Sequence, residues 1–296
     1  MSNKTSLYIG TAGWSYPDWR GLVYPQRRSQ DFSELEYLSH FFNTVELNVT
    51  FYRIPPKQYV EKWSRTVREK NFLFCVKLGQ QYTHTEHLPD KQDTLAFKAS
   101  LQPLFENNQI GALLIQFPWR FKFSKTHLER LSRILDRFSE YHPAVEFRHK
   151  SWICKDTLQL LRDHNAAFVN IDQPVIGKSI EPSALTTSPV GYCRLHGRNY
   201  KNWFQEGAGR DARYDYLYND QILSQWAKYI RSVADQCEQT FVVFNNHFRG
   251  QAAVNAFQMK AMLGDRKVKI PKELQQAFPQ LKSITEPEPG ETLSLF

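Results

Sequence analysis

Short apolar runs alternate with amphipathic segments along most of this chain. The runs are rich in β-branched and aromatic residues, and they predict strands at 7–13, 44–48, 72–77, 112–117, 144–148, 167–172, 191–196 and 240–246. Apolar residues spaced three and four apart lie between them, and they predict helices at 32–42, 58–69, 94–106, 126–138, 157–164, 222–236 and 252–263. Strands and helices in this alternation predict a parallel sheet covered by helices. We therefore expect an α/β fold, a single (β/α)8 TIM barrel.

Two parts of the chain depart from this alternation. Residues 173–189 contain three prolines and a glycine, which leave room for only a short helical turn at 181–185. From Pro271 onward the chain is acidic and contains further prolines. We therefore expect a barrel domain over 1–270 and a tail over 271–296 that acts as a spacer.

Pairs of polar residues at positions i and i+2 lie at the carboxyl ends of five predicted strands: Glu46/Asn48, Glu146/Arg148, Asn170/Asp172, Arg194/His196 and Asn245/His247. Successive side chains of a strand point to opposite faces, so the two members of a pair share one face. TIM-barrel enzymes carry their active sites at this end of the barrel. The pairs therefore locate a candidate site.

The same alternation predicts which polar side chains point into the barrel. They are Glu46, Lys77, Gln116, Glu146, Arg148, Asp172, Arg194 and His196. A buried unpaired charge costs several kcal/mol, so these groups must pair with one another or bind something. One interpretation is a self-satisfied salt-bridge layer, with Glu146 joined to Arg148 or Arg194, and Glu46 joined to Lys77.

The other interpretation is a catalytic site. Glu46 or Glu146 would serve as general acid or base and His196 as its proton partner. Asp172 completes the set of catalytic candidates, and Arg148, Arg194 and Arg198 would stabilise negative charge. A divalent metal held by Glu46, Glu146, Asp172, His196 and His247 is the alternative, but arginines on the same faces disfavour it. We expect no metal, and no motif identifies a cofactor.

Aromatic and basic residues gather at the strand ends and in the loops that follow them. The candidate substrate-binding residues are Trp14, Asn48, Tyr52, Lys77, Gln116, Arg148, Trp152, Arg194, Arg198, Asn245, Asn246 and His247. Aromatic side chains beside arginine suit planar or sugar-phosphate ligands. The segment 245–250 also leads into a predicted helix whose amino end faces this rim, a position that often holds phosphate. The competing interpretation is that the aromatic residues only close the top of the core.

Composition narrows the choice of partners. A net charge of +8 favours anionic partners, a small molecule or a nucleic acid, although basic residues spread over helix surfaces give the same total. No stretch approaches the roughly 18 apolar residues that span a membrane, so we expect no membrane partner. The four cysteines lack CxxC spacing, which fits a reducing cytoplasm.

Several separate motifs resemble one known family. They are Tyr-Ile-Gly-Thr-Ala-Gly-Trp-Ser-Tyr at 8–16, Val-Glu-Leu-Asn at 45–48, Ile-Gln-Phe-Pro at 115–118, Val-Glu-Phe-Arg at 145–148, Arg-Leu-His-Gly-Arg at 194–198 and Phe-Asn-Asn-His at 244–247. Together they resemble the YecE-like family, long called domain of unknown function seventy-two, over about 8–263. The resemblance implies a TIM barrel and leaves the reaction open.

The end of the chain carries a second resemblance. Leu293, Leu295 and Phe296 lie in a Leu-Ser-Leu-Phe sequence that is similar to the end of the peptide by which proteins bind the bacterial sliding clamp. Thr292 stands where that peptide has glutamine, which removes a polar anchor. We expect either a docking peptide for the clamp or a segment that folds back onto the barrel.

These observations leave three functional hypotheses. The first is an enzyme acting on a phosphate-containing ligand, a nucleic acid or a nucleotide or sugar phosphate, with hydrolysis of a phosphodiester or related substrate as the reaction. Such an enzyme could process DNA while tethered to the sliding clamp. The second is a sugar isomerase, lyase or hydrolase for a small molecule, and the third is a non-catalytic DNA- or clamp-binding module.

Overall fold

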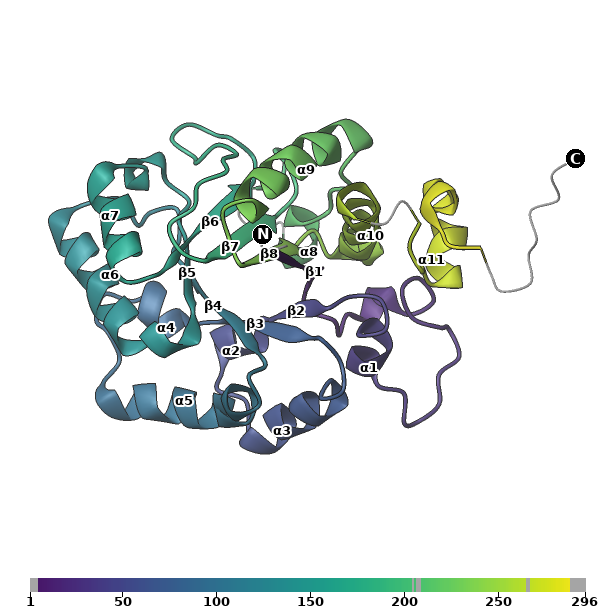
Figure 1. The fold of residues 1–296 in the computed structure, drawn as a ribbon, viewed down its shortest axis with the longest axis horizontal. Helices are drawn as coiled ribbons and strands as arrows, with labels where there is room; N and C mark the ends of the chain where they lie inside the picture. The colour runs from purple at the N-terminus through teal and green to yellow at the C-terminus, as the bar shows by residue number, and fades with distance from the viewer. Residues whose placement is uncertain (1–4, 204, 206–208, 265–266, 288–296) are drawn as a thin grey trace, which may run out of the picture.

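Eight parallel strands close into one barrel, with each strand paired to the next and β8 paired to β1 (Figure 1). The computed structural model describes residues 5–203, 205, 209–264 and 267–287. The strands are β1 Ser6–Ala12, β2 Thr44–Leu47, β3 Leu73–Lys77, β4 Ile110–Gln116, β5 Pro143–Glu146, β6 Ala167–Asp172, β7 Val190–Leu195 and β8 Gln239–Phe244. The predicted (β/α)8 barrel is confirmed.

Helices surround this barrel on the outside (Figure 1). The α-helices are α1 Glu34–Leu38, α2 Val49–Tyr52, α3 Lys57–Thr66, α4 Gln80–Thr83, α5 Lys91–Glu106, α6 Lys125–Arg137, α7 Lys155–Asp163, α8 Gly209–Arg213, α9 Asp220–Ala234, α10 Gln251–Leu263 and α11 Lys272–Ala277. Short 3-10 helices are η1 Pro17–Trp19, η2 Ser139–Tyr141, η3 Lys150–Trp152, η4 Phe248–Gly250 and η5 Pro279–Ile284.

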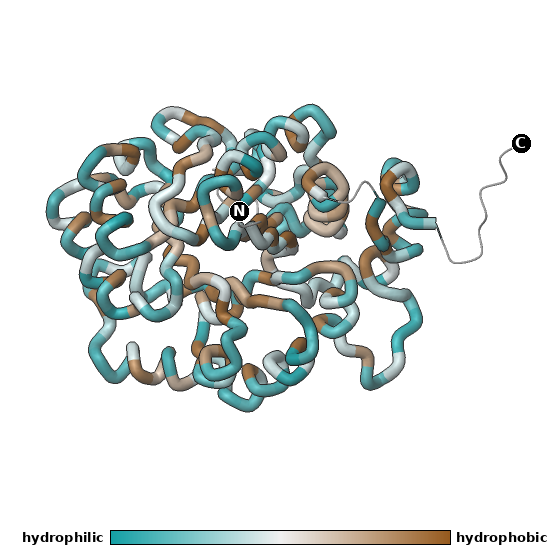
Figure 2. The backbone as a smooth tube through the Cα atoms, in the orientation of Figure 1, coloured by the Kyte–Doolittle hydropathy of each residue, from teal (hydrophilic) through white to brown (hydrophobic). Residues whose placement is uncertain are grey.

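Helix α6 shows how the sequence produces this outer layer. Ser124 caps its first turn by accepting a hydrogen bond from the His127 amide, which satisfies one of the free backbone donors. Leu131, Ile134 and Leu135 then recur at helical spacing and are fully buried against the barrel, as the periodicity predicts. Figure 2 shows the result for the whole chain, with hydrophobic segments in the strands and hydrophilic residues on the outer helix surfaces. No helix in the described ranges is long and apolar enough to cross a bilayer.

The sixth connection and the tail differ from the sequence prediction. Residues 173–189 contain no helix, so the short turn predicted there does not form. Residues 272–284 form α11 and η5 instead of a spacer, and Leu274 and Leu281 are fully buried. These two apolar side chains join the core, and the division of the chain at 270/271 stays a prediction. Residues 288–296, which hold the clamp-like sequence, lie outside the described residues.

Candidate functional site

A bidentate ion pair between β2 and β7 forms the floor of the site. Arg194 donates from Nε to Oε2 of Glu46 at 2.8 Å and from Nη2 to Oε1 at 2.7 Å. Tyr192 donates its hydroxyl to Oε2 of Glu46 at 3.0 Å. All three side chains are buried, so both carboxylate oxygens of Glu46 are satisfied inside the barrel.

Glu146 at the end of β5 is shared by three donors. It lies 3.0 Å from Nη1 of Arg194, 2.8 Å from Nε of Arg148 and 3.2 Å from Nε2 of His196. Burial by itself would raise the pKa of Glu146, but these three neighbours hold its pKa well below the usual range. Glu146 is therefore ionised at neutral pH and has no proton to donate as a general acid.

His196 is fully buried between Glu146 and Asn245. Nδ2 of Asn245 lies 3.0 Å from Nδ1 of His196, whose Nε2 lies 3.2 Å from Glu146 and 3.2 Å from Nη2 of Arg148. Burial lowers the pKa of His196 to about 3; the charges of Arg148 and Arg194 add to the lowering, and Glu146 opposes it. The imidazole is therefore neutral at neutral pH and lies against Glu146, and its role as a proton partner stays a prediction.

The two predicted acid–base carboxylates thus lie in a salt-bridge layer, which was the competing interpretation of the sequence. Its pairing differs from the predicted pairing in one respect. Arg194 binds both Glu46 and Glu146, while Lys77, the predicted partner of Glu46, forms no ion pair with a described carboxylate.

Lys77, at the end of β3, stands apart from this layer. Its side chain is 8% exposed, and its Nζ lies 3.9 Å from the centre of the Phe51 ring. Burial lowers the pKa of Lys77 to about 7, and Arg194 contributes to the lowering. Lys77 is therefore a group of this site that changes its protonation state near neutral pH.

Part of the long connection after β7 lies over the site, and we call its described residues, 197–203, 205 and 209–218, the covering loop. Trp203 is buried over the guanidinium of Arg148, whose carbon lies 5.4 Å from the ring centre. Tyr214 lies near His196 and near His247, with ring centres 6.4 and 5.3 Å away. These aromatic rings shield the salt-bridge layer from water.

The structure corrects the predicted position of Asp172. In β6, Ile171 pairs with Arg194 and Asp172 pairs with Leu195, so Asp172 points toward the helices and not into the barrel. Its oxygens accept hydrogen bonds from Arg198, Tyr218 and the Nε1 of Trp226. Because Arg198 and Tyr218 lie at the two ends of the covering loop, Asp172 fixes both ends.

Two predicted substrate-binding residues also lie away from the site. Trp152 is fully buried, donates to the carbonyl of Phe121 at 2.6 Å and stacks on Phe147. Asn246 is fully buried on the helix side of β8, where it donates to the carbonyl of Tyr216. Both side chains stabilise the fold, because their strands and loops turn them into the core.

The remaining predicted residues surround the site at different depths. Asn48, Gln116 and Trp14 are half-buried, and Trp14 packs edge-on against Trp63. Tyr52 is 67% exposed. His247 is buried and stacks on Tyr16 with ring centres 4.5 Å apart. Of the five candidate metal ligands, Glu146 and His196 are in contact, but among the described residues no three His, Cys, Asp or Glu side chains gather as a metal site.

Sequence reasoning missed three residues of the site. Tyr192 lies two positions before Arg194, so an extension of the i, i+2 rule toward the middle of the strand would have found it. Tyr214 begins a Tyr-x-Tyr-x-Tyr sequence, which is a visible but unspecific signal. His84 carries no signal, because only the fold brings its ring within 5.1 Å of Phe51.

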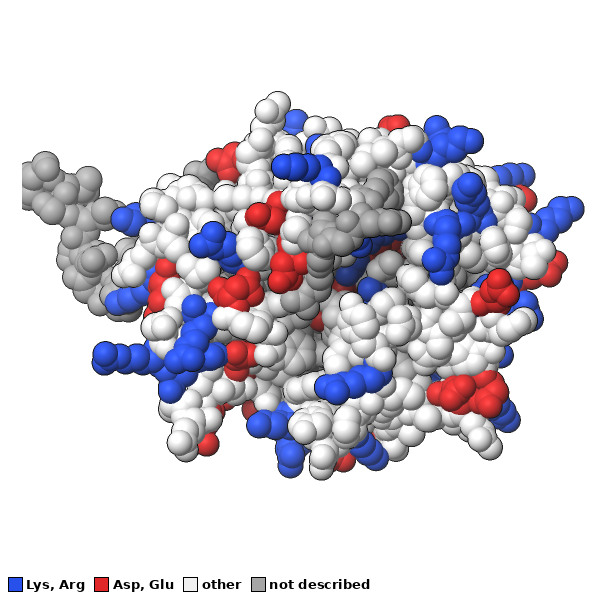
Figure 3. All heavy atoms as spheres, turned by 180° about the vertical axis from the view of Figure 1, so that it is seen from behind, with Lys and Arg blue, Asp and Glu red and all other residues white. Residues whose placement is uncertain are grey.

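Positive charge exceeds negative charge in this region. Arg148 and Arg194 balance two carboxylates, Glu46 and Glu146, and Arg198 and Asp172 neutralise each other. The surplus is therefore Lys77 in its protonated form. Figure 3 shows a hollow near the middle of one face that is bordered by Lys and Arg side chains and also by Asp and Glu side chains. The charge balance favours an anionic ligand.

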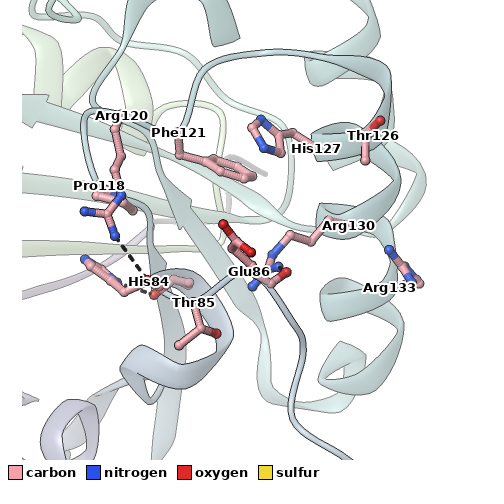
Figure 4. Close-up of a pocket in the computed structure, with 11 residues that line it drawn as sticks. His84, Thr85, Glu86, Pro118, Arg120, Phe121, Thr126, His127, Arg130 and Arg133 are labelled. Atoms are coloured by element: carbon pink, nitrogen blue, oxygen red, sulfur yellow. Dashed lines mark hydrogen bonds between the residues drawn. The ribbon is translucent and has the colours of Figure 1, made fainter.

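A cavity of about 500 Å³ next to the site adds to this surplus, and we call it the basic cavity (Figure 4). Its charged lining consists of Arg120, Arg130 and Arg133 with one carboxylate, Glu86. His84 joins the cavity to the site: its backbone carbonyl accepts a hydrogen bond from Arg120, and its ring lies against Phe51. Burial lowers the pKa of His84 to about 4, and the charges of Lys77, Arg120 and Arg148 add to the lowering.

Comparison with known proteins agrees with this geometry. The family model described as "Protein of unknown function DUF72" matches residues 8–280. The chain belongs to the DUF72 family. The UPF0759 protein YunF of Bacillus subtilis (strain 168) is 34% identical over 271 residues, which cover 87% of this chain and 94% of YunF. The UPF0759 protein YecE of Escherichia coli (strain K12) is 30% identical over 151 residues, about half of each chain.

Solved DUF72 structures share the fold. A DUF72 protein from Thermotoga maritima MSB8 has a TM-score of 0.76 and 35% identity, and the match covers 87% of this chain and 99% of that protein. A DUF72 protein from Enterococcus faecalis V583 has a TM-score of 0.77 and 27% identity, with 87% and 95% covered. The resemblance to the YecE-like family is confirmed, and the family description assigns no reaction.

Proposed function

We propose that this DUF72 protein is an enzyme that acts on a phosphate-containing ligand at the carboxyl end of the barrel. The observation that carries the proposal is the positive charge at this end of the barrel: protonated Lys77 has no described carboxylate partner, and the three arginines of the basic cavity lie with one carboxylate, Glu86. Arg148 keeps part of its side chain exposed, so it can donate hydrogen bonds to a phosphate oxygen.

One candidate for this phosphate-containing ligand is a nucleic acid strand, which carries a phosphate at every nucleotide. The basic cavity supports it, since its arginines lie next to the site and could hold a neighbouring phosphate. A tether to the bacterial sliding clamp through Leu293, Leu295 and Phe296 rests on the sequence alone. Equal recovery of purified clamp by the full chain and by a chain lacking residues 293–296 would remove the tether from the proposal.

Ligand-induced stabilisation tests the proposal directly. A ligand that binds only the folded state raises the melting temperature, so ribose 5-phosphate is expected to raise it and ribose at matched ionic strength is not. The substitution Arg148→Gln should abolish the difference. The control Arg68→Gln removes an exposed charge in the turn that follows α3 and should leave it unchanged.

Binding of a fluorescein-labelled single-stranded oligonucleotide distinguishes a nucleic acid ligand from a small phosphate compound. If a strand binds, its anisotropy should rise on binding, and the affinity should fall steeply as salt increases, because bound phosphates release counterions. The variant Arg120→Gln should weaken oligonucleotide binding more than the ribose 5-phosphate response. If neither compound binds at low salt, the proposed function is wrong.

A further inference from the structure

The surroundings of Lys77 are not those of a lysine that serves only as a fixed positive charge. Its side chain is almost completely enclosed at the carboxyl end of β3, yet the described residues give it no carboxylate partner. The two carboxylates whose charges act on Lys77 are Glu46 and Glu146. They already accept hydrogen bonds from Arg194 and Arg148. A lysine buried to bind a carboxylate of the protein would be paired with one.

The surroundings of Lys77 favour its neutral amine. Burial keeps Nζ from water, and this desolvation together with the charges of Arg194 and Arg148 lowers the pKa of Lys77. The face of the Phe51 ring and the carboxylates of Glu46 and Glu146 attract an ammonium ion, but they do not offset the lowering. With a pKa of about 7, roughly half of the Lys77 amine is unprotonated at neutral pH. For an ordinary lysine that fraction is smaller by a factor of about 10³. A neutral lysine amine in a site is a nucleophile for carbonyl carbon.

We propose that Lys77 forms a Schiff base with the carbonyl carbon of a phosphorylated aldehyde or ketone. The proposal rests on the proposed function, since Arg148 and the basic cavity supply the positive charge that would hold the phosphate of the same molecule. Two sources share this chemistry: a free sugar phosphate in its open-chain form, and an abasic deoxyribose within a nucleic acid strand.

The reaction balances without an oxidant or reductant. The Nζ lone pair adds to the carbonyl carbon, and the C=O π electrons move to oxygen, which takes a proton. The nitrogen then loses a proton, the C–O bond breaks as oxygen leaves as water with a second proton, and the nitrogen lone pair forms the C=N bond. Overall, a neutral amine, a carbonyl compound and one proton from solvent give an iminium ion and water. The iminium ion then draws electrons from a bond next to it, which is the catalytic use of such an adduct.

Borohydride trapping tests the proposal, because it reduces the C=N bond to a stable secondary amine. The full chain is incubated with glyceraldehyde 3-phosphate, with unphosphorylated glyceraldehyde, or with an oligonucleotide carrying an abasic site, and is then reduced. Intact mass and peptide mapping locate the adduct. We expect glyceraldehyde 3-phosphate or the abasic strand to label Lys77 at least tenfold more than any exposed lysine, and the better substrate identifies the source.

Two variants complete the design. Lys77→Arg keeps the charge but cannot form the adduct, and it should lose the label. The matched control Lys62→Arg alters an exposed lysine on α3 and should keep the label on Lys77. If Lys77→Arg does not fold, the peptide map of the labelled parent protein shows whether the adduct lies on Lys77. A label spread over surface lysines without enrichment at Lys77 would overturn the proposal.

Labelling with and without phosphate, together with the melting temperature, also distinguishes the Schiff base from phosphate binding. Equal labelling of Lys77 by glyceraldehyde with and without phosphate would support the Schiff base and contradict the phosphate ligand. If Lys77 remains unlabelled while ribose 5-phosphate still raises the melting temperature, the Schiff base is wrong and the phosphate-binding site stands.

Discussion

The substitution Glu46→Gln tests whether the floor of the barrel is a structural salt-bridge layer. Arg194 is 1% exposed and makes two hydrogen bonds to Glu46, with one more to Glu146. Glutamine has nearly the same shape, but its amide group is a donor and would meet the donors of Arg194 or the hydroxyl of Tyr192. The guanidinium then stays buried with one shared carboxylate in place of two.

The expected magnitude follows from the burial of this pair. Removing one partner of a buried ion pair typically costs about 3–5 kcal/mol, because the other charge is left without compensation. The unfolding entropy of roughly 2.1 cal/mol/K per residue over 296 residues is about 0.6 kcal/mol/K. We therefore expect the melting temperature to fall by about 5–8 °C.

Urea unfolding followed by circular dichroism measures the loss of stability. Glu61→Gln, which changes an exposed carboxylate on α3, is the control and should change the free energy of unfolding by less than about 0.5 kcal/mol. The double change Glu46→Leu with Arg194→Met should recover most of the loss, since an apolar pair replaces both charges. A cost below about 1 kcal/mol for Glu46→Gln would refute the salt-bridge layer and return Glu46 to the role of a free acid or base.

Two further predictions follow from the site. The pKa of His196 is lowered from 6.5 to about 3 in the folded chain, so the unfolded chain binds this proton first as the pH falls. The free energy of unfolding should therefore fall by a few kcal/mol between pH 6.5 and pH 3. His196→Asn should make urea unfolding less dependent on pH over this range, and an unchanged pH dependence would contradict the lowered pKa. Asp172→Asn should loosen the covering loop, because one of the two oxygens that accept hydrogen bonds from Arg198, Tyr218 and Trp226 is replaced by a donor. Limited proteolysis should cut the covering loop faster than in the parent chain, while equal rates would show that the loop is held elsewhere.

The sequence predicted the barrel and most of its lining well because both depend on simple periodicities. Alternation along β2, β5 and β7 placed Glu46, Glu146 and Arg194 inside the barrel, where the structure has them. The same rule failed for Asp172. In β6 the polar residues Asn170 and Asp172 are buried on the helix side, so polarity does not mark the interior face of this strand, and only the pairing with β7 shows it.

The partners of each charge could not be predicted from the sequence. Glu46 is followed closely by Lys77 in chain order, yet it pairs with Arg194 across the barrel, 148 residues away. Pairing is decided by distances across the interior, which depend on strand order and register. The role of Trp152 was missed for a related reason: a loop aromatic can cover a ligand site or fill the core, and only the packing on Phe147 distinguishes the two.

The sequence by itself therefore determined the architecture, the end of the barrel that carries polar groups and the excess of positive charge, because these are properties of local pattern and composition. The tertiary structure decided which charges cancel. It joined Glu46 and Glu146 to arginines, turned Asp172 toward the helices and left Lys77 enclosed without a described carboxylate partner. The chemistry of a buried charge depends on what lies within a few ångströms of it, and those neighbours come from distant parts of the chain.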